Sequence, residues 1–279
     1  MSLALAHSRA RTGVHAPAVR VEVYLAAGLP ALNIVGLPEA AVRESRDRVR
    51  AAIQCAQLEF PSRRITVNLA PADLPKDGGR FDLPIALGIL AANGVFEVSA
   101  LAGIEFLGEL SLTGELRTVD GVLPAALQAA REGRALVVPA GNGGEAALAG
   151  DVRAFTARTL LEVVAHLKGE KRLPAAERDT DGLAPLLHPD LADVRGQAQA
   201  RRALEIAAAG AHHLLLIGPP GCGKTLLASR LPGLLPPASE AEALESAVVA
   251  SVSGRGLDLT FFILGVAFLV IAVTRRPAP

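Results

Sequence analysis

The chain has 279 residues, which is enough for two domains or for one large one. Hydrophobic residues make up 51% of the sequence, so it can bury a sizeable core. Its 28 basic residues balance its 28 acidic ones, which gives a net charge of +0. No overall positive field therefore attracts the chain to nucleic acid, and DNA binding would need a local basic patch or an oligomeric ring.

Neither the cysteines nor the N-terminus indicates export. Cys55 and Cys222 are the two cysteines, too few for a disulfide framework or a cysteine metal cluster. The first residues read MSLALAHSRARTGV and lack the basic start and long apolar run of a signal peptide. These observations predict a cytoplasmic protein.

Residues 1–168 alternate between strand-like and helix-like patterns, which predicts an α/β domain. Apolar and polar residues alternate along 20–36 on both sides of Gly28, and this predicts a hairpin. Another hairpin is expected at 104–117, with Gly114 near its turn. The other expected elements are helices at 37–56, 81–94, 123–133 and 159–169, and strands at 64–70 and 135–142.

Composition changes at residues 169–190, where charges, proline and glycine replace periodic apolar residues. Such a stretch is typical of a linker. A helix is expected within 191–213, followed by the apolar strand LLLI at 214–217. We therefore predict a first domain at 1–168, a linker at 169–190 and a second domain that begins at residue 191.

A phosphate-binding loop follows this strand. The sequence GPPGCGKT fits the G-x-x-x-x-G-K-[ST] pattern, and a helix is predicted after it. Glycines allow positive φ and bring backbone N–H groups against phosphates. The lysine would reach the β- and γ-phosphates, and the threonine hydroxyl would bind Mg²⁺. The predicted ATP-binding residues are Gly218, Pro219, Pro220, Gly221, Cys222, Gly223, Lys224 and Thr225, with Thr225 as the Mg²⁺ ligand.

Cys222 has two interpretations. A small residue in such a loop contributes its main chain, and its sulfur only packs. Alternatively, a thiol near a helix N-terminus has a lowered pKa and can act as a redox switch.

Several long motifs identify a family resemblance. They include NIVGLPEAAVRESRDRVRAAI, RRITVNLAPADLPKDGGRFDLPIALGILAA, FLGELSLTGELR and DVRGQAQARRALEIAAAGAHHLLLIGPPGCGKT. Together they resemble the ComM/YifB family of magnesium-chelatase-like AAA+ ATPases over roughly residues 1–254. The resemblance implies a ribosomal-S5/Lon-protease-like α+β domain followed by the front part of a P-loop AAA+ α/β domain.

The resemblance also implies ligands and partners. ATP and Mg²⁺ are the implied cofactors, and Asp193 and Val194 lie in DVRGQ, which is similar to the segment over the adenine in such modules. The family is associated with DNA processing in natural transformation, as a ring-shaped motor for branch migration. DNA and a homo-oligomeric ring are therefore implied partners.

The Lon-like part raises the alternative of a peptidase. Lon-type proteases place a serine nucleophile in a loop similar to PKDGGRFD, where this chain has Arg80, and their lysine falls near Leu123. A nucleophile needs a hydroxyl or thiol beside a base, so a peptidase is not expected. Lys76, Asp77, Arg80 and Asp82 are interpreted either as a functional polar loop or, preferably, as a surface turn with local ion pairs.

An arginine cluster at 43–64 also has two interpretations. It comprises Arg43, Arg46, Arg48, Arg50, Arg63 and Arg64. The cluster would suit nucleic-acid phosphates. Glu44 and Asp47 are interleaved with it, which favours a salt-bridged helix face.

The chain departs from the family after the phosphate loop. Hydrolysis needs an acidic residue at the end of an apolar strand and an arginine finger. The acidic residues after Thr225 do not end an apolar strand; they are Glu240, Glu242, Glu245 and Asp258. We therefore predict ATP binding without the hydrolysis motifs, in a C-terminally truncated copy whose likeness covers 191–254 of the second domain.

Residues 255–279 form an apolar tail without family likeness. Leu259–Val273 would span about 22 Å as a helix, short of the roughly 30 Å hydrocarbon core. Three interpretations of this tail are possible: a truncated or frame-shifted gene, a membrane anchor through 259–273 and a buried helix.

Two alternatives to an ATP-binding ComM/YifB-type protein also stay open. One is a non-enzymatic remnant with only the N-terminal domain folded, and the other is a magnesium-chelatase ATPase subunit, whose likeness is expected to omit 1–168.

Overall fold

The computed structural model describes residues 2–36, 40–76, 78–178, 188–236, 238–253 and 270–274. The chain divides into two compact units. Unit 1 comprises residues 1–179 and 251–256, and unit 2 comprises residues 180–250 and 257–279.

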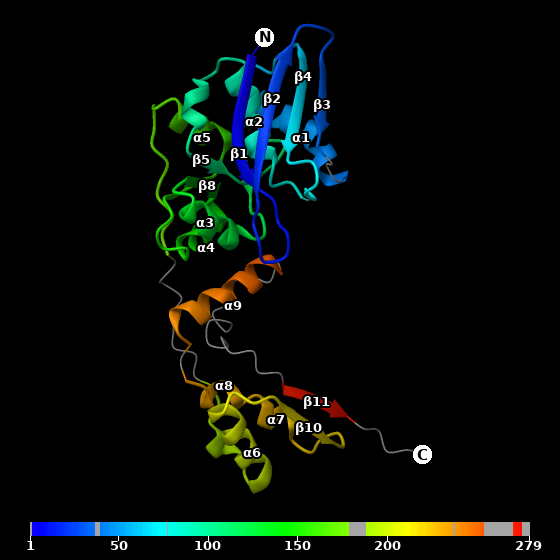
Figure 1. Ribbon diagram of the computed structural model, residues 1–279, viewed down its shortest axis with the longest axis vertical. Helices are drawn as coiled ribbons and strands as arrows, with labels where there is room; N and C mark the ends of the chain where they lie inside the picture. The colour runs from blue at the N-terminus through cyan, green and yellow to red at the C-terminus, as the bar shows by residue number, and fades with distance from the viewer. Residues whose placement is uncertain are drawn as a thin grey trace, which may run out of the picture. The chain divides into compact units, whose positions relative to one another are not determined.

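Among the described residues of unit 1, seven strands form one sheet in the order β3-β4-β2-β1-β5-β8-β9 (Figure 1). Strands β1 and β2 are antiparallel, as are β2 and β4, and every other neighbouring pair is parallel. The mostly parallel sheet with its helices confirms the predicted α/β fold class. The strands are β1 (Ser2–Arg9), β2 (Ala18–Ala26), β3 (Ala31–Val35), β4 (Arg64–Ala70), β5 (Ile104–Phe106), β8 (Ala135–Pro139) and β9 (Ala154–Ala157).

The hairpin predicted for residues 20–36 is wrong. Strands β2 and β3 do not pair with each other, because β4 lies between them and pairs with both. Strand β4 presents Ile65, Val67 and Leu69 to the core, all fully buried, and this alternation suits a central position. The actual partner of β2 on its other side is β1, in a register that runs from Ser2↔Leu25 to Arg9↔Ala18.

The hairpin predicted for residues 104–117 is confirmed only in its second part. Strands β6 (Glu109–Leu110) and β7 (Leu116–Arg117) pair antiparallel, whereas β5 belongs to the large sheet. The helices of unit 1 are α1 (Ala40–Cys55), α2 (Asp82–Ala92), α3 (Val122–Arg131), α4 (Gly143–Ala147) and α5 (Leu160–Leu167), with 3₁₀ turns at Val98–Leu101 and Ala140–Asn142.

Helix α2 lies at the centre of the larger core. All its residues are buried, and it packs on β1 and β2 beside α1 (Figure 1). A Cβ at Gly88 would lie 2.5 Å from Cγ2 of Val23, so glycine is what allows the helix to approach β2 this closely. Helix α5 contributes to the same core.

The β8 end of the sheet is covered on both faces. Val137 faces the core that holds α2 and α5, whereas Leu136 and Val138 face a second core that contains residues of α3 and α4. Every residue of β8 is therefore buried. An apolar run without alternation is the expected sequence of such a strand.

One buried and one partly buried ion pair join elements of unit 1. Arg9 donates to Glu105 from Nε (2.6 Å) and from Nη2 (2.7 Å), and both side chains are almost inaccessible. Asp82, at the start of α2, accepts from Nε of Arg48 (2.8 Å) and from the backbone N–H of Leu110 (3.2 Å). Charges removed from water this way depend on their partners, so each pair fixes the elements that carry it.

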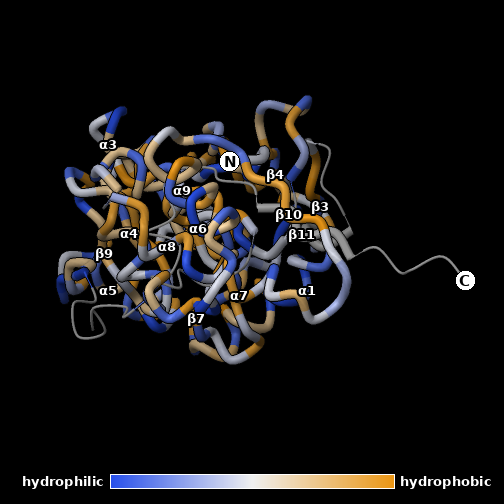
Figure 2. The backbone as a smooth tube through the Cα atoms, turned by 90° about the horizontal axis from the view of Figure 1, so that it is seen from below, coloured by the Kyte–Doolittle hydropathy of each residue, from blue (hydrophilic) through white to orange (hydrophobic). Residues whose placement is uncertain are grey.

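Unit 2 has a much smaller core. It contains the 3₁₀ turn Leu191–Asp193, α6 (Ala198–Ala209), β10 (Leu214–Gly218), α7 (Lys224–Ala228), α8 (Leu231–Leu234), most of α9 (Glu240–Val252) and β11 (Val270–Thr274). Leu191, Val194, Leu204, Leu227 and Leu231 are buried together. Residues 214–217 are all hydrophobic (Figure 2), yet Leu215 and Ile217 are 54% and 63% exposed on one face of β10.

The apolar tail is described only at its end. Val270–Thr274 form β11, which pairs in parallel with β10 from Leu214↔Val270 to Gly218↔Thr274. The helical interpretations of 259–273 are therefore wrong for residues 270–273, where valine and isoleucine favour a strand. Residues 259–269 lie outside the described residues. Within the described ranges, no helix combines the length and apolar character needed to span a bilayer.

We expect limited proteolysis to release unit 1 as a stable fragment. Residues 174–176 belong to the predicted linker but lie along β9, where Ala176 N–H donates to Ala154 O at 2.8 Å. The cut should therefore fall between Ala176 and Asp190, in the stretch rich in charge, proline and glycine. Mass spectrometry of a trypsin time course measures this, and rapid digestion to small peptides would contradict it.

Candidate nucleotide-binding site

The loop Gly218–Thr225 connects β10 to α7. Gly221 and Gly223 have φ values of +80° and +87°, in the left-handed region that only glycine enters without strain. Gly223 is also confined by its surroundings, because a Cβ there would lie 2.8 Å from Nε2 of Gln197. The two glycines let the main chain curl back on itself between the strand and the helix.

Lys224 lies across this curl. Its ammonium group donates to the carbonyl oxygens of Gly218 (3.0 Å) and Pro219 (2.8 Å) and lies 3.6 Å from Sγ of Cys222. The lysine charge is therefore held at the loop, while Thr225 is exposed in the first turn of α7. Curled backbone amides, an ammonium group and a hydroxyl are the donor set that a nucleotide's phosphates and its Mg²⁺ need.

The DVRGQ segment lies beside the loop. Nε2 of Gln197 donates to Cys222 O at 3.0 Å, and Gln197 itself has φ +50°. Asp193 is exposed, but Val194 is 1% exposed and packs in the core of unit 2. Any contact of Val194 with a nucleotide would therefore use its main chain. Gln197 is not among the residues predicted from the sequence, although it is the last residue of the DVRGQ motif.

The described acidic residues after the phosphate loop lie on a helix and not at the end of a strand. Glu240, Glu242 and Glu245 lie on α9, and Glu242 accepts from the backbone N–H (2.9 Å) and hydroxyl (2.7 Å) of Ser239. These hydrogen bonds lower the pKa of the Glu242 carboxyl. A capping carboxylate on a helix is not placed at the end of a strand as a water-activating group is. Asp258 lies outside the described residues.

The polar loop of unit 1 is not a surface turn. Lys76 is fully buried and donates to the carbonyl oxygens of Gly36 (2.9 Å) and Pro71, and burial lowers the pKa of its ammonium group. Arg80 is also buried and donates to Asp120 O and Arg9 O. These side chains join separate loops through backbone carbonyls, which local sequence patterns do not reveal. Asp77 lies outside the described residues.

The peptidase positions carry no nucleophile. Arg80 makes the backbone contacts described above, and Leu123 is fully buried in α3. In the arginine cluster, Arg48 forms ion pairs with Asp82 (2.8 Å) and Glu44 (3.8 Å), and Arg50 lies 4.9 Å from the ring centre of Phe60. For Arg48 this favours the salt-bridged interpretation. The side chain of Arg43 lies outside the described residues.

Two family models match the chain. Residues 21–142 match the model described as subunit ChlI of Mg-chelatase, and residues 190–262 match the model described as magnesium chelatase, subunit ChlI. The likeness therefore extends beyond Gly254, where sequence reasoning ended it. It also includes much of residues 1–168, so the expectation that a chelatase likeness omits that part is wrong.

Three relatives illustrate the family. Competence protein ComM of Haemophilus influenzae is 53% identical over 262 residues, which are 92% of this chain and 52% of that protein. The uncharacterized protein YifB of Salmonella typhimurium is 52% identical over 254 residues, 90% of this chain and 50% of that protein. YifB of Escherichia coli is 50% identical over 252 residues, with the same coverage of 90% and 50%. The chain, which spans about half the length of these relatives, thus belongs to the ComM/YifB family of magnesium-chelatase-like proteins.

Proposed function

We propose that the chain binds ATP with Mg²⁺ at the loop Gly218–Thr225. The observation that carries the proposal is the curled main chain at Gly221 and Gly223 with the Lys224 ammonium held across it. The amides of residues 221–223 would receive the phosphates, and Thr225 would bind the metal ion. Asp193 and Val194, in the segment joined to the loop through Gln197, would border the adenine.

A fluorescent ATP analogue tests this site. We expect Lys224→Ala to weaken binding about 10- to 100-fold, because hydrogen bonds to charged groups contribute about 1.5–3 kcal/mol and every 1.4 kcal/mol is tenfold in affinity. Lys168→Ala is the matched control, since Lys168 is a surface lysine paired with Glu170 at 3.7 Å. Equal binding by both variants would contradict the proposed site. No binding by the unmodified chain would favour a non-enzymatic role for unit 1.

We further propose that the bound nucleotide serves a DNA-processing machine. The name of the Haemophilus influenzae relative, competence protein ComM, supports this role, as does the resemblance to ring-forming branch-migration motors. DNA and further copies of the chain are then the partners. The chelatase models support ATP and Mg²⁺ as the cofactors.

A further inference from the structure

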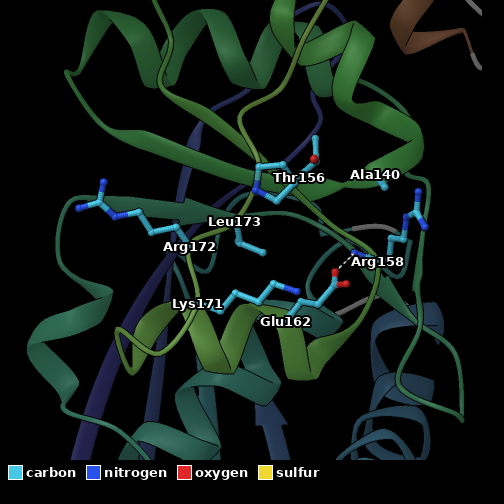
Figure 3. Close-up of a pocket in the computed structure, with 8 residues that line it drawn as sticks. Ala140, Thr156, Arg158, Glu162, Lys171, Arg172 and Leu173 are labelled. Carbon is cyan, nitrogen blue, oxygen red and sulfur yellow. Dashed lines mark hydrogen bonds between the residues drawn. The ribbon is translucent and has the colours of Figure 1, made fainter.

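Unit 1 contains a pocket of about 640 Å³ that is separate from the nucleotide loop (Figure 3). Its walls come from the 3₁₀ turn after β8, from β9 and the residue after it, from α5, and from the segment that follows α5. The lining residues are Ala140, Thr156, Arg158, Glu162, Lys171, Arg172, Leu173 and Pro174.

The segment that carries Lys171 and Arg172 is fixed to the sheet. Thr156 N–H donates to Pro174 O at 3.0 Å, and Ala176 N–H donates to Ala154 O at 2.8 Å. Leu173, which lies between Arg172 and Pro174, is buried, and its N–H donates to Nδ1 of His166 at 3.2 Å. The two cationic side chains therefore extend from an anchored backbone, which reduces the entropy that a ligand must overcome on binding.

The charges of the pocket are unbalanced. Within the described residues, Arg158, Lys171 and Arg172 form no ion pair, and the carboxylate in the lining is Glu162. That carboxylate is already engaged, because its Oε2 accepts from the backbone N–H of Arg158 at 2.7 Å. The Glu162 N–H in turn donates to the Thr159 hydroxyl at 3.2 Å, which completes the N-terminal cap of α5. The pocket thus keeps an excess of positive charge.

The cations are distributed along the pocket rather than gathered at one point. In Figure 3, Arg158 and Arg172 lie on opposite sides, and the Lys171 side chain extends between them in the direction of Glu162. The lining residues include no aromatic ring on which a base could stack. This arrangement suits several phosphates in a row rather than a single phosphate or a nucleobase.

We propose that this pocket binds a linear chain of phosphates through Arg158, Lys171 and Arg172. The phosphodiester backbone of a nucleic-acid strand and inorganic polyphosphate share this chemistry. Recognition through phosphates alone is independent of base sequence and is sensitive to salt. The site lies in unit 1 and does not depend on ATP binding at Lys224.

Fluorescence anisotropy of a labelled single-stranded oligothymidylate tests the pocket, with unlabelled polyphosphate and inorganic phosphate as competitors. We expect the triple variant Arg158→Gln, Lys171→Gln, Arg172→Gln to weaken binding about tenfold or more at low salt. The negative slope of log K against log salt concentration should become shallower by about 2, since each contact to a single strand contributes about −0.7 to it. The matched control, Arg20→Gln with Arg117→Gln and Arg131→Gln, removes the same charge from exposed positions outside both the pocket and the arginine cluster.

The outcomes separate the sources of phosphate. Loss of oligonucleotide binding in the pocket variant, with retention in the control and in Lys224→Ala, supports a nucleic-acid ligand. Binding of labelled polyphosphate alone, lost in the same variant, supports the inorganic source. Equal weakening by the control triple would show that general surface charge governs binding and would overturn the proposal. Competition by inorganic phosphate at the same phosphate concentration would also overturn it, because a single anion would then suffice.

Discussion

A polypeptide of these 279 residues is expected to bind ATP but to release phosphate about 10³–10⁵ times more slowly than an ATPase equipped with an arginine finger. The proposed site holds the phosphates at the loop and uses Thr225 for Mg²⁺. The carboxylates described after it lie on α9, where Glu242 caps the helix and is not positioned to activate water. Binding without transition-state stabilisation does not accelerate the chemical step.

Steady-state phosphate release by the purified polypeptide measures this, with Lys224→Ala prepared in parallel. The background rate should be the same for both proteins. Robust turnover that Lys224→Ala abolishes would show that groups outside the recognised motifs complete the site, and the expectation would be wrong. An unrelated ATPase with a complete site, assayed separately, provides a positive reference.

The second large effect is expected at the buried ion pair of unit 1. Glu105→Gln should lower the free energy of unfolding by about 3 kcal/mol or more, because it leaves the Arg9 guanidinium buried without its main counter-charge. Glu132 stays 2.9 Å from Arg9, but it is 42% exposed and compensates only in part. The amide is close in shape to the carboxylate, so the loss reports charge rather than a cavity.

Urea unfolding followed by tyrosine fluorescence gives the value. The chain has one tyrosine and no tryptophan, and Tyr24 lies on β2, so the signal reports unit 1. Glu170→Gln is the control, since its pair with Lys168 spans 3.7 Å at the surface and such pairs contribute about 1 kcal/mol or less. Equal shifts of the two midpoints would show that the Arg9–Glu105 pair does not stabilise the fold.

Local patterns predicted those elements whose apolar residues alternate or repeat in the usual way. Strand β4 has buried Ile65, Val67 and Leu69 at every second position, and α2 is a continuous apolar helix followed by Gly94. Strand β1 was not predicted because its pattern is inverted. The small Ala4 and Ala6 are buried, whereas Leu3 and Leu5 are 64% and 37% exposed. The larger apolar side chains therefore lie on the exposed face of β1, and a prediction from side-chain size would assign the wrong face to the core.

Strand pairing and long-range side-chain contacts could not be predicted from the sequence. Strand β2 pairs with β1 and β4 instead of β3, which depends on where a strand more than 35 residues later enters the sheet. Lys76 and Arg80 stand in a glycine-rich stretch typical of a turn, yet they are buried against carbonyls from distant loops. The phosphate loop is different. Its spacing predicts the curled backbone at Gly221 and Gly223, because the pattern itself encodes local geometry.

The hydrogen bonds between β9 and residues 174–176 also determine how unit 1 bears mechanical load. A pull on the chain from residue 178 onward acts first on the bond from Arg178 Nε to Ala147 O (3.3 Å), then on the bonds of Ala176 N–H and Pro174 O to β9, the edge strand of the large sheet. Those bonds would open one after another, and the segment carrying Lys171 and Arg172 would separate from β9 while the rest of the unit stayed folded. An anion that bridges this segment to Arg158 would act as a clasp against such peeling.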